Sequence, residues 1–101
     1  MPWVRIASLS DIKPGTLVHH ESGGSTVALC NHEGELHAFN GLCPHRNGPL
    51  GQGNLADGRI ICPWHAWEFD CRSGEYDYNP AIRLDRYPVK VEGDDVLAEI
   101  P

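Results

Sequence analysis

Two cysteine–histidine pairs are the residues of this sequence best suited to chemistry. One residue separates Cys43 from His45, two separate Cys62 from His65, and sixteen lie between the pairs. A lone histidine is most often a surface or hydrogen-bonded residue, and a lone cysteine is most often buried packing. Two such pairs, each in a turn that contains proline, instead indicate a set of thiolate and imidazole ligands for a metal centre.

A structural zinc site with two cysteines and two histidines is one interpretation of this ligand set. The spacing is unfavourable for it, because zinc-binding pairs commonly have about two to four residues between the ligands. Cys43 and His45 have only one residue between them. A pair whose members bind two adjacent iron atoms tolerates the short spacing better, so an iron–sulfur centre is favoured and zinc stays an alternative.

The segments that contain the pairs resemble the two cluster-binding loops of Rieske ferredoxins. The first segment reads CPHRNGPLGQG over residues 43–53, and the second reads CPWHAWEFD over residues 62–70. The similarity extends to the Lys-Pro-Gly turn at 13–15 and to the stretch 87–100, so it covers nearly the whole chain.

The resemblance implies one [2Fe–2S] cluster, with Cys43 and Cys62 on one iron and His45 and His65 on the other. Two neutral imidazoles in place of two thiolates leave the cluster two charges less negative, which raises its reduction potential. The residues expected around the cluster come from both loops and from a third segment that contains proline; they are Gly48, Pro49, Leu50, Trp64, Trp67 and Pro80.

Four positions in these loops indicate which kind of Rieske protein the chain resembles. Respiratory and photosynthetic Rieske proteins carry a disulfide between the loops and hydroxyl groups that hydrogen-bond the cluster. Here the corresponding residues are Gly48, Trp64, Trp67 and Phe69, which supply neither thiol nor hydroxyl. We therefore expect a potential near the low end of the range from about −150 to about +300 mV.

The low-potential form is similar to the ferredoxin components of bacterial ring-hydroxylating oxygenase systems. The resemblance implies a one-electron carrier from a reductase to a terminal oxygenase or similar acceptor, which is not itself an enzyme. Its partners would be redox proteins, with no small-molecule substrate. The alternative is a small subunit of a nitrite-reductase-like complex, a relative in which the ligands are often missing; their retention here favours the carrier.

The rest of the sequence predicts a single all-β domain. Alternation of apolar and polar residues, interrupted by turn residues about every ten positions, marks strands at 3–7, 26–30, 35–39, 87–91 and 96–100. Only residues 8–13 hint at a helical turn. We expect an antiparallel barrel or sandwich base, from about 1–40 and 81–101, with a cluster-binding subdomain inserted at about 41–80.

A glycine-rich segment between Gly41 and Gly58 breaks the alternation. It has five glycines, together with Pro44 and Pro49. Glycine raises the entropy cost of folding and adds no packing area, so this density indicates a loop whose backbone approaches something closely. A metal centre would supply a reason for such a loop to be ordered.

Charge and composition limit the partners. The net charge is −6, with acidic clusters such as 92–95, which argues against nucleic acid and favours a basic protein partner. No apolar run reaches the roughly 18 residues of a membrane helix, and no secretory signal follows Met1, so we expect a soluble protein in the cytoplasm. In that reducing compartment a Cys30–Cys71 disulfide is unexpected, although the sequence leaves it open.

The residues outside the ligand pairs receive no chemical role. We expect Cys30 to be a buried strand residue and Cys71 to lie exposed in a turn. The four histidines outside the pairs are expected to be exposed strand residues; they are His19, His20, His32 and His37.

Overall fold

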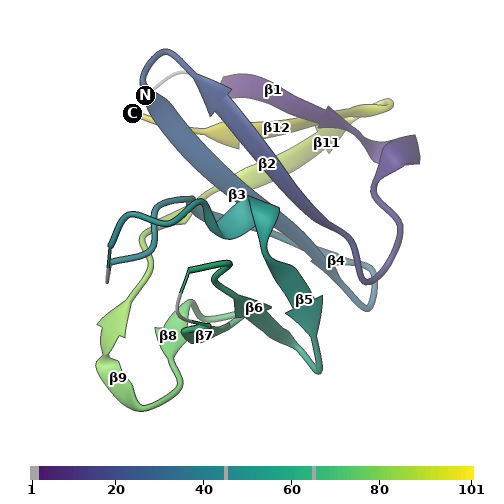
Figure 1. The fold of residues 1–101 in the computed structure, drawn as a ribbon. Helices are drawn as coiled ribbons and strands as arrows, with labels where there is room; N and C mark the ends of the chain where they lie inside the picture. Colours follow the sequence, from purple (N-terminus) through teal and green to yellow (C-terminus); the bar gives the residue numbers. More distant parts are fainter. Residues whose placement is uncertain (1–2, 45, 65) are drawn as a thin grey trace.

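The computed structural model describes residues 3–44, 46–64 and 66–101 (Figure 1). Within these residues the fold is nearly all β, which confirms the predicted class, and its three antiparallel sheets are open rather than closed into a barrel. The predicted helical turn is a short 3-10 helix, η1 (Leu9–Asp11). Neither 3-10 helix of the described residues has the length or apolar composition needed to cross a bilayer.

Each sheet takes its strands from a different part of the chain. The terminal sheet has the order β1 (Trp3–Ser8), β12 (Asp95–Glu99), β11 (Val89–Glu92). The central sheet has the order β10 (Arg86–Tyr87), β4 (Glu35–Asn40), β3 (Ser25–His32), β2 (Leu17–Ser22). The insert sheet has the order β5 (Asn54–Ala56), β6 (Arg59–Ile61), β7 (Glu68–Asp70), β8 (Glu75–Tyr76), β9 (Asn79–Arg83), and η2 (Leu50–Gln52) precedes it.

Strand β3 of the central sheet joins the two hydrophobic cores. Its side chains alternate between faces, so Val27 and Leu29 enter the core shared with the terminal sheet. Ala28 and Cys30 enter the core shared with the insert sheet. All four are fully buried, so a strand covered on both faces separates the two cores. We propose that the base and the cluster-binding subdomain expected from the sequence follow this division.

The predicted strand at 87–91 is divided between two sheets. Tyr87 pairs with Ala38 of the central sheet, whereas Val89 pairs with Ala98 of the terminal sheet. Pro88 lies between them, and proline lacks the N–H that a continuous ladder requires. Strand β2 and the short strands of the insert sheet were not predicted, because their apolar alternation is weak.

The expectation of exposed histidines is wrong, because all four, His20 included, are half-buried. Only 19%, 19% and 13% of the side chains of His19, His32 and His37 are accessible. The register places His19 opposite Ala28 and His37 opposite Cys30, on the face covered by the insert sheet. Their half-burial follows from a second layer that a single strand pattern does not reveal.

Cys71 is also buried, which corrects the expectation of an exposed turn cysteine. It follows β7, and its N–H donates to the carbonyl oxygen of Gly58 (3.0 Å). The thiol of Cys30 donates to the carbonyl oxygen of Cys71 (3.1 Å), and both cysteines are free. Burial, together with the neighbouring Cys71, raises the pKa of Cys30 to about 12. The pair therefore packs as two protonated thiols.

His37 makes the stability of the fold depend on pH. Burial and the nearby Arg86 guanidinium lower its pKa, and the Nη2 of Arg86 lies 3.4 Å from its Nδ1. A lowered pKa means that folding favours neutral imidazole, so stability is complete above the unfolded value of about 6.5 and is lost as the pH falls below it. We expect His37→Gln to lose less unfolding free energy than the wild type between about pH 7.5 and about pH 5.5. Urea titrations at both pH values test this, and parallel losses would contradict it.

Candidate metal centre

Cys43 lies in a tight loop that follows β4. Its N–H donates to the carbonyl oxygen of Gly48 (2.9 Å), and the N–H of Asn47 donates to the carbonyl oxygen of Cys43 (2.7 Å). A bridge between Leu42 and Pro49 closes the base of this loop. Asn47 has a φ of 59°, a left-handed conformation that asparagine tolerates better than most residues. The loop therefore holds the Cys43 side chain in one position.

Cys62 lies in a second loop of similar construction, between β6 and β7. Its N–H donates to the carbonyl oxygen of Trp67 (2.8 Å), five residues later, as Cys43 donates to Gly48. Ala66, just before Trp67, has a φ of 57° and matches the left-handed Asn47 of the first loop. The N–H of Trp64 points at the Cys62 sulfur, with 3.4 Å between nitrogen and Sγ.

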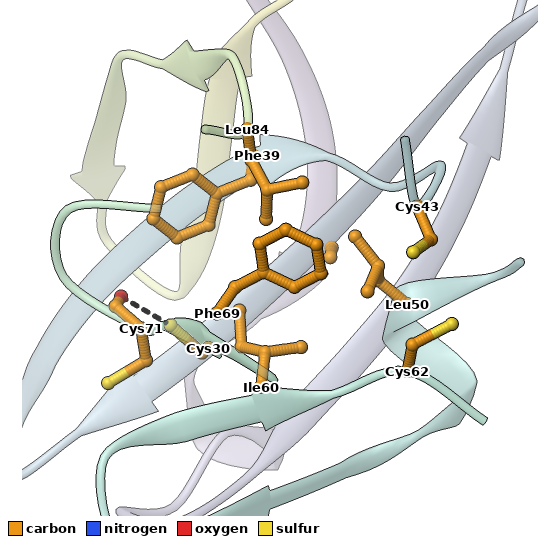
Figure 2. Packing of buried hydrophobic residues seen from close by; sticks show 10 residues of the cluster. Cys30, Phe39, Cys43, Leu50, Ile60, Cys62, Phe69, Cys71 and Leu84 are labelled. Atoms are coloured by element: carbon orange, nitrogen blue, oxygen red, sulfur yellow. Dashed lines mark hydrogen bonds between the residues drawn. The ribbon is translucent and has the colours of Figure 1, made fainter. Parts of the chain in front are cut away.

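The two loops bring Cys43 and Cys62 together at one end of the insert core. Figure 2 shows both cysteines beside Leu50, with Phe69 and Ile60 to their left in the same core. Cys43 is 1% exposed and Cys62 is 2% exposed. Burial, together with the adjacent Cys43, raises the pKa of Cys62 to about 11, although the N–H of Trp64 lowers it.

A buried pair of thiols fits a metal centre, because ionising both without a cation would place two negative charges in an apolar core. Within residues 3–44, 46–64 and 66–101, no group of three or more His, Cys, Asp or Glu side chains is arranged to hold a metal. The described part of the site thus contributes two cysteines. The other two predicted ligands, His45 and His65, lie outside the described residues.

Gly48 forms part of the wall beside Cys62. A Cβ at this position would lie 2.8 Å from the Cys62 Sγ and 3.2 Å from the Trp64 ring. Leu50 is fully buried in the same core, and Pro49 between them is half-buried. The loop backbone thus approaches the cysteines as closely as the glycine content of the sequence indicates.

The aromatic residues of the second loop have different environments. Trp64 is 48% exposed. Trp67 is half-buried and stacks on Tyr76 of β8, with 4.1 Å between ring centroids and 9° between planes. Pro80 is exposed on the edge strand β9, and its expected role beside the cluster stays a prediction.

Sequence reasoning did not identify Asn47, Ala66 or Tyr76 as parts of this site. The Asn-Gly dipeptide at 47–48 is a known turn signal and could have indicated the left-handed Asn47. Ala66 and Tyr76 carry no such signal, because their roles depend on how the loop closes and on which strand packs against it.

Gly48→Ala is expected to lower the metal content of the purified protein. The added methyl group meets the Cys62 sulfur and the Trp64 ring, so the sulfur must move from its position. We expect at least about a tenfold loss of affinity for the metal, as for other changes next to bound ligands. Metal analysis after dialysis against a chelator measures this. An unchanged content would mean that Gly48 does not line the centre.

Comparisons with known proteins agree with this arrangement. A family model described as the Rieske [2Fe–2S] domain matches residues 2–88. The ferredoxin component of an alkene monooxygenase system from Xanthobacter autotrophicus is 38% identical, over 94% of this chain and 79% of the relative. The ferredoxin component of a biphenyl 2,3-dioxygenase from Rhodococcus jostii is 35% identical, over 99% of this chain and 94% of the relative.

Solved structures with the same fold include several kinds of protein. The ferredoxin of carbazole 1,9a-dioxygenase from Nocardioides aromaticivorans has a TM-score of 0.84 and 28% identity, over 97% of both chains. A complex of reduced oxygenase and oxidised ferredoxin in carbazole 1,9a-dioxygenase matches with a TM-score of 0.83 and 26% identity, over 95% of this chain and 91% of that chain. A nitrite reductase small subunit from Mycobacterium tuberculosis matches at 0.81, over 99% of this chain and 96% of that chain, but its 21% identity shows the fold alone.

Proposed function

The chain belongs to the Rieske [2Fe–2S] domain family, and we propose that Cys43, His45, Cys62 and His65 hold its cluster. The observation that carries the ligand assignment is the pair of buried cysteines on two loops closed by the same backbone hydrogen bond. Each loop has its predicted histidine two or three residues after the cysteine. The cluster supplies one-electron oxidation and reduction.

The protein is an electron carrier that passes electrons from a reductase to a terminal oxygenase. This follows from its likeness to ferredoxin components over nearly its full length, and from the oxygenase–ferredoxin complex among the matching structures. It acts as a component of an oxidoreductase system and not as a catalyst. The four-ligand zinc site is set aside, because the family binds a [2Fe–2S] cluster.

The residues next to the cysteines support a cluster of low potential. Phe69 is fully buried, and Trp67 stacks on Tyr76. Neither a phenylalanine nor a tryptophan side chain has a hydroxyl group to offer the site. Gly48 leaves no room for a side chain beside Cys62. The N–H of Trp64 near the Cys62 sulfur acts in the opposite direction, because a hydrogen bond to the sulfur favours the more negative state.

We also propose a cytoplasmic location. The free, fully buried Cys30 and Cys71 support it, since thiols that lie close together persist as thiols in reducing compartments.

Purified protein tests the proposed function. We expect two irons and two acid-labile sulfides per chain, a reddish-brown colour, and a rhombic EPR signal after reduction with dithionite. A redox titration should give a potential of about −150 mV. A colourless protein with one zinc would overturn the assignment. Stable co-elution of the native protein with a large nitrite-reductase subunit would instead favour the small-subunit alternative.

A further inference from the structure

Positive charge is concentrated in one segment of this acidic chain. Residues 83–90 contain three cations and one anion, Arg83, Arg86 and Lys90 against Asp85, whereas the whole chain carries −6. Lys90 lies on β11 and pairs with Glu92 (3.4 Å), so the positive charge of this segment that remains is at Arg83 of β9 and Arg86 of β10.

A groove of about 220 Å³ separates the basic segment from the first cysteine loop. Leu42, Pro44 and Asn47 line it on the loop side; Arg83, Leu84 and Asp85 line it on the other. Pro44 directly follows Cys43, so the groove adjoins the loop of the proposed cluster.

Backbone hydrogen bonds fix both walls of this groove. The N–H of Asn40 donates to the carbonyl oxygen of Asp85 (2.8 Å), and the N–H of Leu84 donates to the carbonyl oxygen of Gly74 (2.9 Å). On the loop side, Asn47 donates to Cys43 (2.7 Å). The groove is therefore formed before any partner binds.

The arginines beside the groove are poorly neutralised within the chain. The ion pair that Arg83 makes, with Glu75, has a separation of 4.0 Å, whereas Arg5 pairs with Asp95 at 2.7 Å. Arg86 approaches the His37 ring and the face of Phe39, and no carboxylate of the described residues lies within ion-pair distance of it. Asp85 is the acidic residue and Arg83 the basic residue among those that line the groove, and Arg86 lines the adjoining hollow together with Arg83.

We propose that this groove docks an acidic segment of a redox partner protein. Carboxylates of the partner pair with Arg83 and Arg86, and an apolar side chain packs on Leu42, which is 40% exposed, and on Pro44. Charge complementarity selects an acidic occupant, although the net charge of the chain alone favours a basic one.

This inference rests on the proposed function and is tested with charged peptides. Hexa-L-glutamate, and hexa-L-lysine as its counterpart, are titrated into the oxidised ¹⁵N-labelled holoprotein and followed by NMR. We expect hexaglutamate to shift the amides of Asn47, Arg83 and Arg86, with binding that is strong at about 0.01 M salt and lost at about 1 M. The double variant Arg83→Glu/Arg86→Glu should bind it at least about fivefold more weakly.

The control variant Arg5→Glu/Lys13→Glu changes the net charge equally but lies on the base, and it should bind hexaglutamate as the wild type does. Three outcomes would overturn the proposal: no shifts, equal losses in both double variants, or tighter binding of a short DNA duplex in the groove. Colour and EPR signal are recorded for every variant. Their absence in the wild type would refute the proposed function, whereas their presence without hexaglutamate binding would refute only the groove.

Discussion

Cys62→Ser is expected to abolish the chromophore and to destabilise the folded chain. Cys62 is 2% exposed and faces Gly48 and the N–H of Trp64, so a replacement has no freedom to move aside. A serine hydroxyl stays protonated where the thiol ionises and is a far weaker ligand for iron. Because ligand binding free energy adds to folding free energy, loss of the cluster also lowers the unfolding midpoint.

Cys30→Ser provides the matched control for that variant. Cys30 is also fully buried, but its sulfur donates to the carbonyl oxygen of Cys71, and a serine hydroxyl can make the same hydrogen bond. We expect full iron content and a modest loss of stability. Iron analysis, the visible spectrum and urea unfolding of both variants measure the difference. Equal chromophore loss in both would show that the effect comes from the core and not from ligation.

Gly53→Ala is expected to have the largest effect of any single methyl group added to a glycine. A Cβ on Gly53 would lie 1.9 Å from the carbonyl oxygen of Ile61 and 3.1 Å from the ring of Pro63. The first contact is with backbone, so β5 and β6 must separate at their paired ends. We expect a loss of about 3 kcal/mol in unfolding free energy, and loss of cluster, because Pro63 directly follows Cys62.

Gly93→Ala is the control, since nothing lies within 4 Å of a Cβ at Gly93. Its φ of 62° makes alanine cost about 1 kcal/mol through the backbone alone. Chemical unfolding of both variants compares a steric with a purely conformational effect. A Gly53→Ala protein as stable as Gly93→Ala would mean that the β5–β6 ends are not packed as described.

The sequence was most informative where chemistry constrains spacing. The motifs at 43–45 and 62–65 and the five alternating strands predicted the family, the cofactor and the nearly all-β fold. The prediction was least accurate for the burial of side chains, because burial depends on how the sheets pack on one another. His19 and His37 read as surface residues because one strand cannot reveal that its second face is covered.

Loop closure was a second source of error. Cys71 was expected to be exposed because it adjoins Arg72 in a polar turn. Its N–H instead donates to the carbonyl oxygen of Gly58, and the residue is fully buried. Pro88 lies inside an alternating stretch whose two halves belong to different sheets. The alternation alone does not show where one strand ends and the next begins. The sequence also does not predict the groove beside the first loop, because its two walls are more than thirty residues apart in the chain.

Histidine ligation is the central claim, and pulsed EPR tests it most directly. Protein grown with ¹⁵N-histidine and reduced with dithionite should show strong hyperfine coupling from two histidine nitrogens to the cluster spin. His65→Cys should remove one coupling and shift the potential toward the value of about −400 mV found with cysteine ligands alone. A reduced wild-type protein that shows a cluster signal but no ¹⁵N coupling would contradict the assignment of His45 and His65.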